Sequence, residues 1–161
     1  MTPSDQLIND LTEWRPAGTG PHSFGHTLDT GWTVGITAES ADTVGCRLTE
    51  LAVARPAPVK PSTAADLKRW AGRTVARATG LLEPLKLIEM DAARSEAVLR
   101  SETPAQRGTS IEYYEVLLRG RQAATLKRYK ASRTGTGKRR AVPFALTHEA
   151  IAKLAGDLTA D

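Results

Sequence analysis

The segment that most constrains the fold is residues 111–132, IEYYEVLLRGRQAATLKRYKAS, which has the composition of two extended runs. A short polar stretch that contains Gly120 separates the two runs. Glycine readily adopts the positive φ that a tight hairpin turn requires. The segment therefore predicts a two-stranded hairpin, which we take as the centre of the fold.

The same region carries most of the excess positive charge of the chain. Residues 116–148 hold nine Lys or Arg and no Asp or Glu, whereas the rest of the chain holds 13 basic and 18 acidic residues. The formal net charge of +4 thus comes from one basic ribbon on an otherwise acidic protein. Within this ribbon, the Gly- and Thr-rich residues 133–140 predict a flexible basic loop.

The register of the hairpin decides which side chains share a face. A two-residue turn places three cross-strand pairs on one face: Tyr114 with Lys127, Val116 with Thr125, and Leu118 with Ala123. The second face then carries a partly apolar set: Ile111, Tyr113, Glu115, Leu117, Ala124, Leu126 and Arg128. Helices on one side cover only one face, so the second is either core covered by other parts of the chain or an exposed patch for a partner.

The N-terminal part of the chain predicts a short helix followed by three strands. Ser4 is placed to cap the helix. Residues 22–38 alternate with a period of two around Thr30-Gly31, which predicts a hairpin that turns there. A third strand over about residues 43–54 changes its apolar face halfway, and a bulge near Thr49-Glu50 would explain the change.

A long central helix is predicted over residues 63–79. Thr63 and Asp66 form a capping-box pattern at its start, and Gly80 is suited to end it. Apolar residues recur between them at the spacing of one helix face. We therefore expect this helix to lie across the sheet.

The remaining predicted elements are two further strands, the hairpin and a last helix: residues 85–90, residues 96–102, residues 111–132, and a helix capped by Thr147. Because short turns join consecutive strands, most of the pairing should be antiparallel. The sequence therefore predicts a single α+β domain over residues 1–161, in which a long central helix and shorter N- and C-terminal helices pack on a mostly antiparallel sheet of about seven strands.

This order of elements resembles that of the small bacterial type III secretion chaperones. The shared order is a helix, three strands, a helix, strands and a final helix. The resemblance implies a dimeric α+β protein that binds segments of other proteins. The chain differs from those typically acidic proteins in its basic net charge and in two additional strands.

Three short motifs resemble parts of catalytic or ligand-binding sites. Asp29-Thr30-Gly31 is the triplet of retropepsin-like aspartic proteases, but Trp32 follows it instead of a small residue, so ordinary turn chemistry is favoured. Residues 135–138, GTGK, lack the upstream glycine and the Ser or Thr after lysine that a phosphate loop requires. His22 and His26 lie about 13 Å apart on a strand, too far to chelate one metal ion together with Cys46 without a bend. We therefore expect no catalytic residues, no metal and no cofactor.

The N-terminus and the single Cys46 indicate the compartment. The first ten residues lack the basic and apolar parts of a signal peptide. No apolar run approaches the roughly 18 residues of a spanning helix. The sequence therefore predicts a cytoplasmic protein that does not enter a membrane.

The favoured function is a non-enzymatic binding module that uses a basic, aromatic-containing sheet face to hold a partner protein or a second copy of itself. The residues predicted to contact this partner are Tyr113, Leu117, Leu126 and Arg128. The alternative that the protein is an enzyme of unrecognised type stays open.

Two alternatives also stay open. The first is binding of nucleic acid through Lys127, Arg128, Lys130, Lys138, Arg139 and Arg140, beside the tyrosines of the hairpin. The second is binding of a small ligand in a cavity between the sheet and the central helix.

Overall fold

The computed structural model describes residues 1–58 and 60–159, so residues 59, 160 and 161 of the expected domain lie outside the described residues. The elements in chain order are α1 (Pro3–Glu13), β1 (His22–Thr27), β2 (Thr33–Ala41), β3 (Gly45–Ala54), α2 (Ala64–Arg77), β4 (Leu85–Asp91), β5 (Glu96–Ser101), β6 (Ala105–Arg107), β7 (Ser110–Arg119), β8 (Ala123–Ser132), β9 (Arg140–Val142), β10 (Phe144–Thr147) and α3 (His148–Thr159).

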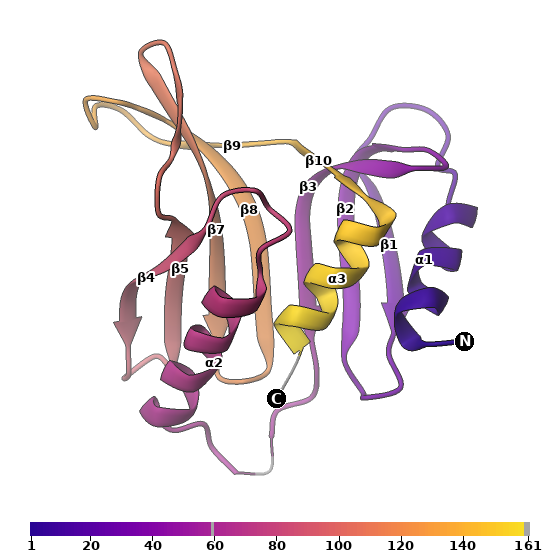
Figure 1. Cartoon of the computed structure of the whole chain (residues 1–161), viewed down its shortest axis with the longest axis horizontal. Coiled ribbons are helices and arrows are strands. Elements are labelled where there is room, and N and C mark those ends of the chain that lie inside the picture. The colour runs from indigo at the N-terminus through magenta and orange to yellow at the C-terminus, as the bar shows by residue number, and fades with distance from the viewer. Residues whose placement is uncertain (59, 160–161) are drawn as a thin grey trace.

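The described residues form an α+β fold in which three helices pack on one face of a ten-stranded antiparallel sheet (Figure 1). The main path of the sheet runs β1-β2-β3-β8-β7-β5-β4. The α+β class and the antiparallel pairing are thus confirmed. The number of strands is larger than expected because β6, β9 and β10, of three or four residues each, add to the seven predicted strands.

The sheet has two halves that meet between β3 and β8. These two strands pair only through Leu51–Ala54 and Ala123–Leu126. The first half of β3 pairs instead with β10, while β8 pairs with β9. The segment 140–147 therefore bridges the two halves where β3 and β8 diverge, as Figure 1 shows.

The helices differ from the prediction at their ends. Thr2, not Ser4, caps α1, because its hydroxyl accepts a hydrogen bond from the Asp5 amide and its own amide donates to the Asp5 carboxylate. The capping box of Thr63 and Asp66 at α2 is confirmed. The helices have 11, 14 and 12 residues, and α2 already ends at Arg77, so a long central helix that stops at Gly80 is not confirmed.

The bulge expected in the third strand is present. Thr37 pairs with Glu50 and Ala38 pairs with Leu48, so Thr49 is the extra residue between them. The bulge lets apolar residues of opposite parity reach one face of the sheet. Those buried residues are Cys46, Leu48, Leu51 and Val53.

The predicted register of the hairpin is wrong by one residue. Arg119 pairs with Ala123, so the turn has three residues, and both Gly120 and Arg121 adopt positive φ, of 51° and 60°. Tyr114 therefore lies opposite Arg128 instead of Lys127. A shift of one residue exchanges the two faces of β8, because side chains alternate along a strand.

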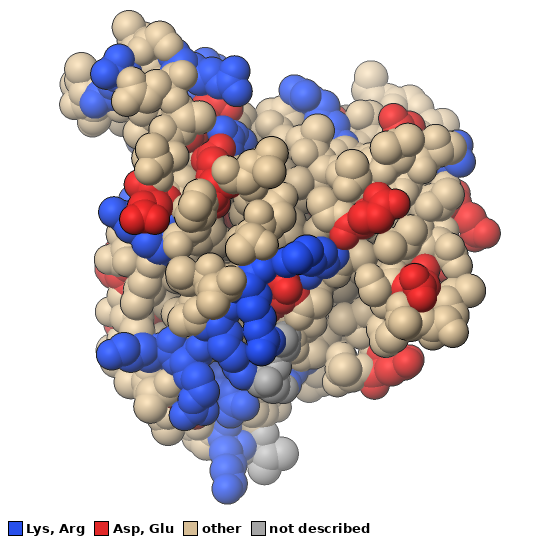
Figure 2. All heavy atoms as spheres, viewed as in Figure 1, with Lys and Arg blue, Asp and Glu red and all other residues tan. Residues whose placement is uncertain are grey.

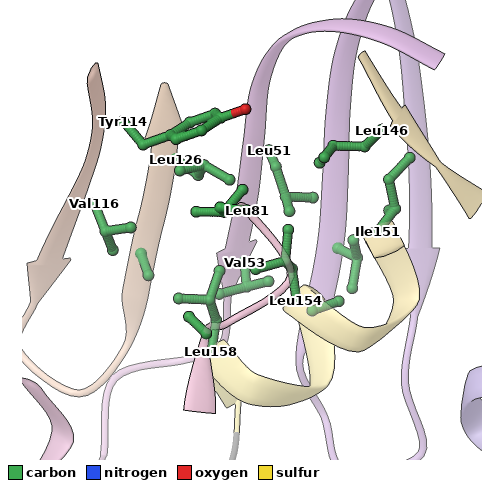
Figure 3. Packing of buried hydrophobic residues seen from close by; sticks show 14 of the residues in the cluster. Leu51, Val53, Leu81, Tyr114, Val116, Leu126, Leu146, Ile151, Leu154 and Leu158 are labelled. Atoms are coloured by element: carbon green, nitrogen blue, oxygen red, sulfur yellow. The ribbon is translucent and has the colours of Figure 1, made fainter. Parts of the chain in front are cut away.

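One hydrophobic core fills the space between the sheet and the helices. Figure 3 shows strand residues such as Leu51, Val116 and Leu126 turned toward Leu154 and Leu158 of α3. The Trp70 indole donates a 3.0 Å hydrogen bond to the Leu158 carbonyl and so joins α2 to α3. No helix within residues 1–58 and 60–159 combines the length and the apolar character needed to cross a membrane.

Candidate functional site: the open face of the sheet

The open face is the side of the sheet opposite the three helices. Alternation along β7 sends Tyr114, Val116 and Leu118 into the core and Tyr113, Glu115 and Leu117 onto the open face. The cross-strand partners of these three on β8 are Tyr129, Lys127 and Thr125. The hairpin therefore has one core face and one face that the described helices leave uncovered.

The four residues predicted to contact a partner do not share a face. Tyr113 and Leu117 lie on the open face. Leu126, 1% exposed, and Arg128, 6% exposed, lie on the helix-covered face. The cause of the separation is the turn, whose third residue shifts β8 against β7 and reverses its faces.

A row of apolar and small side chains crosses the middle of the open face. Ala52 pairs with Thr125, Thr125 with Leu117, and Leu117 with Val98. These four residues, here called the apolar band, are all half-buried. Since neighbouring strands lie about 4.8 Å apart, the band extends roughly 14 Å across β3, β8, β7 and β5.

Charged residues of alternating sign follow the band on one side. On the other side β3 and β8 carry Ala54 and Ala123, and one ion pair flanks the band. On one side, Lys127 lies 3.8 Å from Glu50, and Arg100 lies 3.8 Å from Glu115. On the other side, Arg119 lies 4.0 Å from Glu96. These cross-strand pairs keep the charged side chains beside the band, so the band itself stays free of charge.

Arg139 closes one side of this surface. Its guanidinium lies 3.8 Å above the Tyr129 ring and donates hydrogen bonds to the Tyr113 hydroxyl, at 3.3 Å, and to the Glu115 carboxylate. Burial lowers the pKa of Arg139, but these two acceptors outweigh burial and raise the pKa above its usual value. Because Arg100 also faces Glu115, two cations share one carboxylate, and the surface has an excess of positive charge here.

A hollow of about 260 Å³ lies between the band and Arg139. Its walls combine apolar and charged side chains from β3, β7, β8 and the loop before β9. The lining residues are Glu50, Glu115, Leu117, Arg119, Thr125, Lys127, Tyr129 and Arg139. The open face is thus hollowed where Tyr129 and the band meet.

Half of the residues predicted to bind nucleic acid are engaged within the protein. Lys127 faces Glu50, and Arg139 faces Glu115. Arg128 donates hydrogen bonds to Glu83 at 3.0 Å and to Glu112 at 3.3 Å, and it lies 4.4 Å above the Tyr114 ring. Arg128 therefore has a structural role on the helix-covered face.

The other three cations of that set gather around a second hollow, of about 280 Å³. It is lined by Lys130, Lys138 and Arg140 together with Thr109, Ser110, Ala131, Ser132 and Thr136. No carboxylate is among these lining residues, all of which belong to the described part of the chain. This arrangement suits an anion, because ammonium, guanidinium and hydroxyl groups all donate hydrogen bonds.

Positive charge is not confined to the segment 116–148. Figure 2, which views the helix-covered side, shows Lys and Arg gathered over α2. The outward side chains of α2 include Lys68, Arg69, Arg73 and Arg77. A basic surface therefore also lies over α2, outside the basic ribbon of the sequence.

The two histidines and the cysteine that were candidate metal ligands have other contacts in the structure. His22 donates to the Gly18 carbonyl, and His26 lies 2.6 Å from the Asp10 carboxylate. Burial raises the pKa of the Cys46 thiol to about 11, so the thiol stays protonated. Within the described residues, no three or more His, Cys, Asp or Glu side chains group as a metal site.

Sequence reasoning missed the parts of the surface that come from outside the hairpin. Val98 and Arg100 lie on β5, Ala52 lies on β3, and Arg139 reaches the tyrosines from the loop. Alternation in residues 96–102 carried a signal for Val98 and Arg100, since both face away from the buried Leu99. No local sequence pattern indicates which strands are neighbours in the sheet. The apolar band, which crosses four strands, could therefore not be predicted from the sequence.

The sequence matches no model of a known protein family and no curated protein, and the structure matches no solved structure. The functional proposal below therefore depends on the geometry of the chain itself.

Proposed function

We propose that the protein is a non-enzymatic binding module whose open face receives an amphipathic helix of a partner protein. The observation that carries the proposal is the apolar band with a charged row on one side and the Arg119–Glu96 pair on the other, on a face that the described helices leave uncovered. A contiguous apolar surface with a polar rim is typical of an interaction site.

The geometry of the band favours a helix over an extended peptide. Extended peptides bind mainly through backbone hydrogen bonds at the edge of a sheet, whereas helices pack on sheet faces. Ala52 and Thr125 have small side chains that let a helix approach the sheet closely. A band of roughly 14 Å accommodates about nine residues of a helix at 1.5 Å per residue.

The charges beside the band favour an acidic partner. Arg100 and Arg139 share the single carboxylate of Glu115, and Arg119 is exposed at the other side. A helix with an apolar stripe flanked by Asp or Glu complements this arrangement. Tyr129, half-buried beneath Arg139, adds aromatic surface, which is enriched at protein interfaces.

A library of randomised helical peptides provides a probe for this proposal. The library is selected against the wild-type protein, and the enriched peptides are then measured against Leu117→Lys and Thr125→Arg. We expect acidic, amphipathic peptides whose dissociation constants rise at least about tenfold in both variants, because both changes place a cation within the band. Fluorescence anisotropy gives the dissociation constants.

Val44→Lys is the matched control, since Val44 is 63% exposed and lies away from the band. Circular dichroism establishes that each variant is folded. The proposal is wrong if no enriched peptide depends on Leu117 and Thr125, or if Val44→Lys weakens binding as much as Leu117→Lys.

A second candidate function, binding of single-stranded nucleic acid, is favoured by the carboxylate-free hollow around Lys130, Lys138 and Arg140. Three phosphate contacts give a binding constant that falls about twentyfold between 50 and 200 mM salt. We expect Lys138→Glu/Arg140→Glu to abolish retention of a labelled 20-nucleotide strand in a filter-binding assay. This function is ruled out if the wild-type protein does not retain the labelled oligonucleotide at 50 mM salt.

A further inference from the structure

The last strand of the sheet, β4, combines a free edge with exposed apolar side chains. It pairs with β5 on one side and with none of the described strands on the other. Leu87 and Ile88 of β4 are 40% and 42% exposed. A free edge with exposed apolar residues is a template for pairing with another strand.

The opposite end of the sheet lacks these features. The outward residues of β1 are Ser23, Gly25 and Thr27, which offer little apolar surface. Helix α1 lies beside β1, where Asp10 contacts His26. The two ends of the sheet are therefore unlike, and only β4 presents large apolar side chains.

A bulge at Ile88 sets the faces of β4. Lys86 lies opposite Arg100 and Glu89 lies opposite Val98, and both partners belong to the open face of β5. In a regular strand, Lys86 and Glu89 would point to opposite faces because they are three residues apart. The extra residue at the bulge places both side chains on the open face. By the same shift, Leu85 and Met90 both lie on the helix-covered face, opposite Ser101 and Ala97.

We propose that two copies of the chain associate through their β4 strands, antiparallel, with Leu87 opposite Ile88 of the second copy. In this register Lys86 lies opposite Glu89 of the second copy. The two-fold axis generates a second pair, in which Glu89 lies opposite Lys86 of the second copy. Leu85 likewise lies opposite Met90 of the second copy. Each charged residue meets its opposite sign, and each apolar residue meets an apolar one.

The bulge selects this register. Facing residues of an antiparallel pair must lie on the same side of the sheet. The neighbouring registers fail this requirement. One places Lys86 opposite Met90 of the second copy and the other places Leu85 opposite Glu89, and in each case the two residues lie on opposite faces. Only with Leu87 opposite Ile88 do Lys86 and Glu89 share a face across the two-fold axis.

The resulting dimer has one continuous sheet, with the helices of both copies on the same side. Its interface consists of a single pair of strands, which is smaller than the surface of a stable dimer. We therefore expect a weak association that depends on protein concentration. This inference is independent of the proposed function, because it uses the edge of the sheet and not the open face.

Charge reversals at the two-fold axis test the proposal by sedimentation equilibrium over a range of concentrations. Lys86→Glu alone and Glu89→Lys alone each place like charges together twice, so each should raise the dissociation constant of the dimer at least about tenfold. An equal mixture of the two single variants restores both attractive pairs, and it should associate at least as well as the wild-type protein. The double variant Lys86→Glu/Glu89→Lys should do the same.

Controls separate this interface from other surfaces. Lys138→Glu makes the same charge change far from β4 and should leave the dissociation constant unchanged, as should Leu117→Lys on the open face. Lys86 and Glu89 are exposed, so the variants are expected to fold, and circular dichroism verifies this. The proposal is overturned if the wild-type protein is a monomer at every concentration, if the single reversals do not weaken association, or if mixing them restores nothing.

Discussion

Arg128 shows how a residue that looks functional in sequence becomes structural in the fold. It stands in a basic run beside tyrosines, which is typical of nucleic-acid or partner contacts. In the structure its guanidinium lies between Glu83 and Glu112 and above the Tyr114 ring. The two carboxylates that neutralise Arg128 come from 45 and 16 residues away in the chain, so the sequence around Arg128 contains no sign of them.

Replacement of Arg128 should therefore cost stability. Arg128→Met keeps an apolar stem over Tyr114 but leaves Glu83 without its cation and Glu112 with Arg107 alone. We expect the free energy of unfolding to fall by about 3 kcal/mol, because removing one partner of a buried ion pair leaves uncompensated charge. Urea denaturation measures the change.

Lys130→Met is the matched control, since Lys130 lies on the same strand and lines a surface hollow. We expect a change within about 0.5 kcal/mol for this variant. Equal effects of the two substitutions would contradict the structural role of Arg128.

The elements were predictable where their patterns were long. Alternation over six to ten residues located β1, β5, β7 and β8, and the change of face in residues 43–54 located the bulge at Thr49. Strands of three or four residues, such as β9 and β10, are too short to show a period. The register of the hairpin was missed for another reason: a turn of two residues and a turn of three differ only in backbone geometry around Gly120 and Arg121.

Gly45 provides a test of the pairing between β3 and β10. A Cβ added at Gly45 would collide with the Leu146 carbonyl oxygen and lie 3.1 Å from the Thr147 Cα. Both atoms belong to the backbone of β10. We expect Gly45→Ala to lower the free energy of unfolding by about 2 kcal/mol, because the strands must separate to admit the methyl group. Hydrogen exchange at the Leu146 amide should accelerate as well.

Gly35→Ala on β2 is the control, since the nearest atom to its added Cβ is 3.9 Å away. That distance is an ordinary van der Waals contact, so little destabilisation is expected. If Gly35→Ala destabilised the protein as much as Gly45→Ala, the close approach of β10 would not be the cause.

At the scale of the whole molecule, sequence reasoning predicted the class of the fold and not its arrangement. Short turns between strands sufficed to predict an antiparallel α+β fold. The order of strands in the sheet depends on long-range pairing between β3 and β8, about 70 residues apart in the chain, which periodicity does not report. The apolar band and the free edge of β4 both follow from that order, so neither was accessible before the structure.

The path of residues 140–147 has a consequence for how the protein is made. Residues 144–159, which form β10 and α3, complete the N-terminal half of the sheet: β10 covers the edge of β3, and α3 packs against α1. While the chain is being synthesised, the edge of β3 and the apolar side chains Leu7 and Leu11 stay incompletely covered until residues 144–159 have been made. We therefore expect the N-terminal half of the sheet to complete its folding only after β10 and α3 have been synthesised, although its own strands precede them in the chain.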